Sequence, residues 1–109
     1  MTVKPVVPRA QARADAESAI DYYLAEGAPD AALGFVDALE QAYTYLSRNA
    51  GTGSPRYGHE LGVMGLRSWP LSTYPFLLFY LEHDEHIDIW RVLHTRRDIP
   101  VRMAAPDSP

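Results

Sequence analysis

The chain of 109 residues contains no cysteine and only one lysine, Lys4. The lack of cysteine excludes a disulfide scaffold, a thiolate zinc site and a cysteine nucleophile. The other basic residues are arginines, and the formal net charge is −4. Proteins that bind nucleic acid through its phosphates need a basic field, so we expect no direct nucleic-acid binding.

Long apolar runs are also absent from the sequence. The N-terminal segment lacks the pattern of a signal peptide, and no stretch is apolar for long enough to span a bilayer. We therefore expect a cytoplasmic protein without a membrane partner. The length predicts one domain, which we place at residues 1–98, followed by an extended or disordered tail over residues 99–109.

Two amphipathic helices are predicted in the first half of the chain. Apolar side chains recur at three- and four-residue spacing over residues 8–26, and more clearly over residues 29–48. Gly27 is a suitable helix stop, and Pro29 is a suitable first residue for the next helix. Because the connection is short, we expect the two helices to pack as an antiparallel hairpin.

The remaining segments predict strands and one loop. Pro5 limits residues 2–7 to an edge strand, and glycines and prolines indicate a loop over residues 49–62. Strands are expected at residues 65–69, 75–82 and 86–94, with a slip in the alternation before Val92 and a last turn longer than two residues. The order β-α-α-β-β-β predicts an α+β fold in which the helical hairpin covers one face of an antiparallel sheet.

The order and spacing of these segments are similar to those of a known family. The motifs are Gly65-Leu66-Arg67, the aromatic strand of residues 74–80, and a last strand that ends in Arg91-Val92-Leu93-His94-Thr95-Arg96-Arg97-Asp98. The N-terminal half adds Ala14-Asp15, Ile20-Asp21-Tyr22-Tyr23 and the segment of residues 31–46. Over about residues 8–98, the chain resembles the RelE/ParE toxin superfamily.

The resemblance implies the toxin of a type II toxin–antitoxin system, which acts in growth inhibition and plasmid stabilisation. A cognate antitoxin, with a disordered segment that folds on the toxin, would hold it inactive in a hetero-oligomer. No cofactor is implied. One branch of the superfamily cleaves messenger RNA on the ribosome, and the ParE branch inhibits DNA gyrase by binding it.

The residues favour the ParE branch. The RNA-cleaving branch uses lysines near the second strand, an arginine in the third strand and a tyrosine near the end. Here Val63, Gly65 and Leu77 stand near these positions, and no tyrosine follows Tyr80. Only Arg96, or its neighbour Arg97, matches that set. We therefore expect an inhibitory binding protein rather than a nuclease.

The last strand and its exit are the candidate site for the target. Arg91, His94, Arg96 and Arg97 are expected to contact gyrase, whereas the sequence does not identify the residues that bind the antitoxin. If the chain is instead a ribosome-dependent endoribonuclease, His94, Arg67 and Arg96 would supply the acid–base group and the phosphate clamp. A third possibility is a non-toxic subunit that stabilises its partner.

Each candidate also has a structural interpretation. A histidine at the end of a strand, such as His94, often bonds to the backbone, and Arg96 and Arg97 are typical of a solvated turn. Arg67 would pair with a helix carboxylate such as Asp21 or Glu40.

Two further groups of residues have structural interpretations. A polar hairpin is favoured over a metal site for His83, Asp84, Glu85, His86 and Asp88, so no metal is expected. We expect a set of aromatic residues to form the core and the surface that faces the antitoxin. This set comprises Tyr22, Tyr23, Tyr43, Tyr45, Phe76, Phe79 and Trp90.

Overall fold

Two long helices form one layer of the fold and a four-stranded sheet forms the other. The computed structural model describes residues 3–96. The helices are α1 (Ala10–Ala25), α2 (Pro29–Asn49), the 3-10 turn η1 (Ala50–Thr52) and the short α3 (Arg56–Leu61). The strands are β1 (Val6–Pro8), β2 (Arg67–Pro70), β3 (Phe76–Glu82) and β4 (Ile87–His94). The predicted α+β architecture is confirmed, and the tail expected at residues 99–109 lies outside the described residues.

The sheet is mixed rather than wholly antiparallel. Its strand order is β1-β4-β3-β2, and β2, β3 and β4 form an antiparallel meander as predicted. The edge strand β1 instead runs parallel to β4, with Val6 opposite Ile87 and Pro8 opposite Ile89. The sequence indicated that β1 is an edge strand but not its direction, because alternation identifies a strand without identifying its neighbour.

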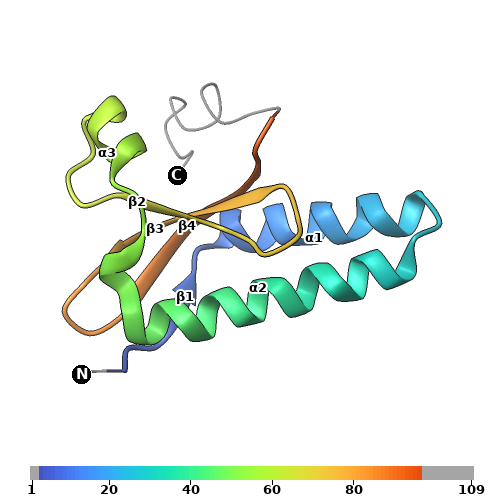
Figure 1. Cartoon of the computed structure of the whole chain (residues 1–109), viewed down its shortest axis with the longest axis horizontal. Helices are drawn as coiled ribbons and strands as arrows, with labels where there is room; N and C mark the ends of the chain where they lie inside the picture. Colours follow the sequence, from blue (N-terminus) through green and yellow to red (C-terminus); the bar gives the residue numbers. More distant parts are fainter. Residues whose placement is uncertain (1–2, 97–109) are drawn as a thin grey trace.

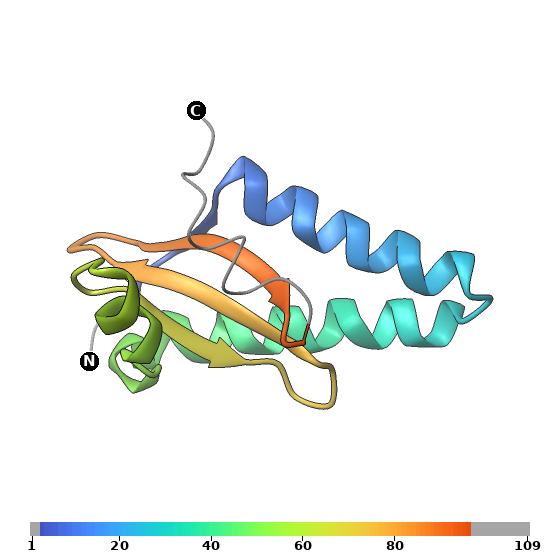
Figure 2. The same cartoon turned by 90° about the horizontal axis from the view of Figure 1, so that it is seen from above.

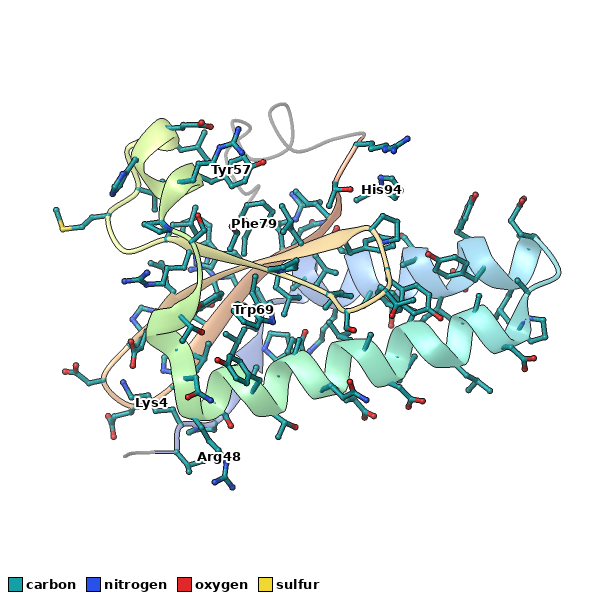
Figure 3. The ribbon with its side chains drawn as sticks, in the orientation of Figure 1. Lys4, Arg48, Tyr57, Trp69, Phe79 and His94 are labelled. Carbon is teal, nitrogen blue, oxygen red and sulfur yellow. The ribbon has the colours of Figure 1, made fainter. Side chains whose placement is uncertain are left out.

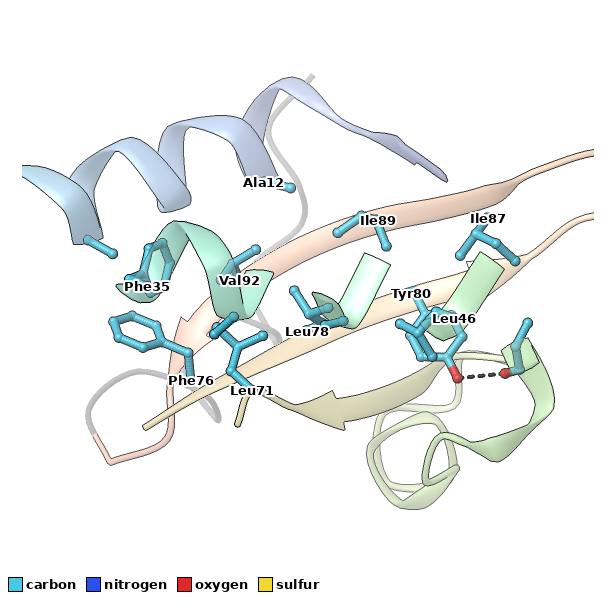
Figure 4. Close-up of a cluster of buried hydrophobic side chains, with 14 residues drawn as sticks. Ala12, Phe35, Leu46, Leu71, Phe76, Leu78, Tyr80, Ile87, Ile89 and Val92 are labelled. Atoms are coloured by element: carbon cyan, nitrogen blue, oxygen red, sulfur yellow. Dashed lines mark hydrogen bonds between the residues drawn. The ribbon is translucent and has the colours of Figure 1, made fainter. Parts of the chain in front are cut away.

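The helical hairpin forms as predicted and covers one face of the sheet (Figures 1 and 2). Gly27 adopts a φ of +71°, a left-handed conformation that ends α1, and Pro29 opens α2. The main core lies between the two layers (Figure 4), where Phe35, Leu46 and Leu78 are fully buried. Among residues 3–96, no helix is both long and apolar enough to cross a membrane.

A β-bulge explains the slip in the alternation of β4. Phe79 of β3 lies opposite Arg91, and the next residue, Tyr80, lies opposite Ile89, so Trp90 is an extra residue in β4. The bulge allows Ile89 and Val92, three residues apart, to enter the same core cluster. The turn before β4 has four residues, closed by the bond from the His83 N–H to the carbonyl of His86 (2.8 Å), which confirms the longer turn.

The other face of the sheet carries a second, smaller cluster of buried residues. Leu66, Phe79 and Leu93 form it, and Tyr57 of α3 packs edge-on against Phe79 with ring centroids 5.3 Å apart (Figure 3). The prediction of a loop over residues 49–62 was therefore wrong for η1 and α3. The six residues of α3 are too few to form a helix by their own propensity, so packing on the sheet determines this helix.

Candidate partner-binding groove at the end of β4

A groove of about 700 Å³ lies between α1 and the C-terminal end of β4. It forms because β1 ends at Pro8, opposite Ile89, so that within residues 3–96 no strand pairs with the outer side of β4 beyond this point. The lining residues are Asp15, Ser18, Ala19, Tyr22, Tyr23, Pro75, Phe76, Val92, Leu93, His94 and Arg96. The groove therefore joins the first helix to the exit of the last strand.

Asp15 of α1 stands where a neighbouring strand would otherwise pair with β4. Its Oδ2 accepts the Val92 N–H at 3.0 Å and Arg91 Nε at 2.8 Å, and its Oδ1 accepts Arg91 Nη2 at 2.8 Å. The ion pair is almost fully buried, with side-chain exposures of 9% for Arg91 and 8% for Asp15. The carboxylate of Asp15 thus accepts a backbone N–H at the edge of β4 and holds α1 against this strand.

The structure places the four candidate target-binding residues in different environments. Arg91 is buried in the ion pair with Asp15 and presents little surface to a partner. His94 is half-buried and Arg96 is exposed, and both line the groove. Arg97 lies outside the described residues. The structure therefore brings His94 and Arg96 together and assigns Arg91 to the interior.

His94 is held in place by a ring contact and a backbone bond. Its ring packs edge-on against Phe76, with centroids 5.3 Å apart, and its Nδ1 accepts the backbone N–H of Arg96 at 3.1 Å. A neutral imidazole that accepts at Nδ1 carries its proton on Nε2. His94 thus makes the backbone bond expected of a histidine at a strand end, and it also helps to form the wall of the groove.

Arg67 is not part of this site. It lies on β2 opposite Tyr80, whereas His94 lies opposite Phe76, so the two positions are four residues apart along β3, or about 13 Å. Its guanidinium donates to the carbonyl of Gly53 at 2.7 Å, so the predicted pairing with Asp21 or Glu40 was wrong. The structure does not assemble the trio His94, Arg67 and Arg96 that the nuclease alternative requires.

Comparison with known proteins identifies the family. Residues 6–99 match the family described as "ParE toxin of type II toxin-antitoxin system, parDE". The chain belongs to the ParE toxin family. A search of the curated proteins finds no match.

A solved structure shares the fold of this ParE-family chain. It is described as "Chromosomal ParDE TA system from P. aeruginosa", and it superposes with a TM-score of 0.71 at 24% sequence identity. The match covers 86% of this chain and 98% of that chain. At this identity the likeness is evidence for the fold alone, and it agrees with the α+β architecture predicted from the sequence.

No sequence pattern indicated the groove in this ParE-family chain. Asp15 looks like Glu17 and Asp21, the other acidic residues of α1, and only the structure shows that it reaches β4. Some of the aromatic residues that were expected in the core or on the surface are buried, and others are exposed. Phe76 and Phe79 are buried, whereas Tyr22 and Tyr45 are about half exposed.

The polar hairpin between β3 and β4 lies at the other end of the sheet. The rings of His83 and His86 stack with centroids 4.7 Å apart, and His83 Nε2 lies 3.2 Å from Asp88 Oδ2. No cluster of three or more metal-ligating side chains occurs within residues 3–96. The hairpin is bound to the N-terminal segment instead, because Lys4 Nζ donates to Glu82 Oε2 at 2.7 Å.

Asp88 joins β4 to the start of α1. It accepts two bonds from Arg9, at 3.0 and 2.9 Å, and one from Trp90 Nε1 at 3.3 Å, while the Arg9 guanidinium lies over the Trp90 ring. Burial by itself would raise the pKa of Asp88, but the bonds from Arg9 and His83 outweigh it and hold the pKa below the usual value of 3.8.

The lowered pKa of Asp88 predicts an acid-sensitive contribution to stability. A carboxyl group with a depressed folded-state pKa contributes stability above its unfolded pKa, and this contribution is lost as the pH falls through the folded-state pKa. We expect Asp88→Asn to cost about 1–2 kcal/mol at neutral pH. The cost should shrink below about pH 4 in urea titrations followed by circular dichroism.

The exposed Asp84→Asn in the same hairpin is the matched control for Asp88→Asn. Its stability profile should follow that of the wild type across the acid range. A cost of Asp88→Asn that is unchanged at low pH would contradict the assignment of this contribution to the carboxylate.

Proposed function

We propose that this chain inhibits DNA gyrase by binding it in the cytoplasm, and that a cognate antitoxin neutralises it in a toxin–antitoxin hetero-oligomer. The proposal depends on the arrangement of the residues at the C-terminal end of β4. There Arg96 presents an exposed guanidinium beside the half-buried His94, at the rim of a groove rather than in a closed catalytic pocket. Membership in the ParE family supports the proposal.

The positions of the other basic residues favour binding over RNA cleavage. Lys4, the one lysine, is bound to Glu82 and to the carbonyl of His83, at the opposite end of the sheet from His94 (Figure 3). Arg67 is bound to Gly53, and Arg91 is bound to Asp15. Cleavage through the 2′-hydroxyl needs several such groups around one phosphate. The residues at the groove instead suit the recognition of a protein surface.

Induction of the chain in cells without its antitoxin tests the proposed target. We expect growth to stop and the negative supercoiling of a reporter plasmid to fall in chloroquine gels, with no codon-linked cuts in primer extension on translated messages. Early codon-linked cuts that His94→Ala abolishes would replace the proposal with an endoribonuclease. Normal growth would instead favour a non-toxic subunit.

Arg96→Glu is expected to weaken gyrase inhibition at least tenfold, measured as the concentration that halves supercoiling. The substitution reverses the charge of the most exposed cation in the groove, and charge reversal at an interface produces repulsion. Because Arg96 is exposed, the free energy of unfolding should change by less than about 0.5 kcal/mol.

Arg56→Glu provides the matched control for this charge reversal. Arg56 is also an exposed arginine, but it lies on α3 beside Glu60 and away from the groove. This variant should inhibit gyrase within about twofold of the wild type. An equal loss of gyrase inhibition in both variants would show that inhibition depends on the net charge of the chain and not on the residues at the C-terminal end of β4.

A further inference from the structure

The loop of residues 71–75, between β2 and β3, lies beside the C-terminal end of β4 (Figure 2). The backbone N–H of Thr95 donates to the carbonyl of Pro75 in this loop at 2.9 Å. The neighbours of Thr95 in the chain are His94 and Arg96, the two groove residues proposed to contact gyrase. The loop therefore continues the surface that these two residues form.

Both ends of this loop are fixed by the core. Leu71 is 5% exposed, and its N–H donates to the carbonyl of Phe76 at 3.0 Å, which closes the loop. The ring of Tyr74 packs edge-on against Tyr23 and Phe35, with centroids 5.7 and 6.0 Å apart. Because the loop is held in shape before a partner binds, binding costs it little entropy.

Thr73, near the tip of this loop, has a backbone conformation that its side chain disfavours. Its φ is +75°, and within residues 3–96 it is the one residue other than glycine with a positive φ. A β-branched residue in this left-handed region is a steric outlier, whereas glycine or asparagine would fit there readily. Such strain persists where the surrounding structure imposes it, and it is concentrated at functional sites.

The tip of the loop presents two hydroxyl groups to solvent. Ser72 and Thr73 are both exposed, and neither hydroxyl makes a hydrogen bond to another residue in the described part of the chain. The strained Thr73 side chain thus has no hydrogen-bond partner among these residues. A hydroxyl both donates and accepts, so the tip places two such groups near the exposed cation of Arg96. This combination suits the polar rim of a protein interface.

We infer that Ser72 and Thr73 form a second contact with gyrase, next to the contact made by Arg96. The matching surface of gyrase presents a carboxylate to Arg96 and hydrogen-bonding groups to the two hydroxyls. The side chain of Thr73 makes the contact, since glycine would give the same loop with less strain. This inference rests on the proposed function and adds to it a loop that contributes to the recognition of the target.

Chemical blocking of position 73 tests the contact. The chain has no cysteine, so Thr73→Cys supplies a single thiol that a bulky maleimide can modify after folding. We expect modification to raise the concentration that halves supercoiling by purified gyrase about tenfold over the unmodified variant. Thr44→Cys is the matched control, because Thr44 is also exposed but lies on α2. Its modification should change that concentration less than about twofold.

Thr73→Gly separates the side chain from the backbone, and it carries the test if Thr73→Cys does not fold. Glycine removes the strain, so the thermal midpoint of this variant should equal or exceed that of the wild type. Because the hydroxyl and methyl groups are lost, the concentration that halves supercoiling should rise about fivefold. A lower thermal midpoint together with weaker inhibition would assign Thr73 to the stability of the fold and overturn the inference.

The outcomes separate this inference from the proposed function. If modified Thr73→Cys and Thr73→Gly inhibit gyrase as well as the wild type does, while Arg96→Glu does not, the inference is overturned and the proposed function stands. An equal loss in modified Thr44→Cys also overturns the inference, because added bulk would then weaken inhibition wherever it is placed. Failure of the folded wild-type chain to inhibit gyrase overturns the proposed function, and the inference with it.

Discussion

Replacement of Asp15 by alanine is expected to lower the free energy of unfolding by about 3–5 kcal/mol. The substitution leaves the buried guanidinium of Arg91 without its counter-charge and removes the acceptor from the Val92 N–H. Both groups are shielded from water, so solvent cannot replace the lost bonds. Urea denaturation followed by circular dichroism measures the change.

Two comparisons isolate the ion pair as the cause. Asp21→Ala removes an exposed carboxylate from the same helix and should change the stability by less than about 0.5 kcal/mol. The double variant Asp15→Ala with Arg91→Met should recover part of the loss, because it no longer buries an unpaired charge. If Asp15→Ala costs no more than Asp21→Ala, the carboxylate does not fix α1 to the edge of β4.

Tyr80→Phe is expected to cost about 2–4 kcal/mol, since it deprives two buried groups of a partner. The Tyr80 hydroxyl donates to the carbonyl of Ala50 at 2.6 Å (Figure 4). It also accepts the N–H of Gly53 at 3.0 Å. Burial raises the pKa of Tyr80, so the hydroxyl stays protonated and can donate. The bonds join the 3-10 turn after α2 to the centre of the sheet.

The control is Tyr45→Phe, which removes a hydroxyl from a side chain that is 40% exposed and stacks on Trp69. Its expected cost is below about 0.5 kcal/mol. Chemical denaturation of both variants, with amide exchange at Gly53 in Tyr80→Phe, checks the assignment. If both variants lose the same free energy of unfolding, or if the Gly53 amide stays protected from exchange in Tyr80→Phe, the Tyr80 hydroxyl is not needed to hold the 3-10 turn on the sheet.

The parts of the fold set by local periodicity were predictable from the sequence. The 3.6-residue pattern located both long helices, and Gly27 and Pro29 marked their junction within a residue or two. The slip before Val92 correctly indicated the irregularity that the structure shows as a bulge. These features depend on neighbours along the chain, so a sequence pattern can carry them.

Features that depend on distant contacts were not predictable. The direction of β1 depends on its pairing with β4, about 80 residues later in the chain. The helix α3 depends on packing against Phe79. The same limit applies to the groove. Arg91 looked like an exposed member of an arginine-rich motif, and only its contact with Asp15 shows that it stabilises the interior.

A supercoiling assay with purified gyrase and the antitoxin-free chain is the most direct test of the central claim, that the exit of β4 binds gyrase. The account predicts that the wild-type chain and Arg56→Glu block supercoiling of relaxed plasmid at similar concentrations, and that Arg96→Glu needs at least ten times more protein. Full supercoiling at every concentration of the folded wild-type chain, or equal inhibition by Arg96→Glu, would contradict it.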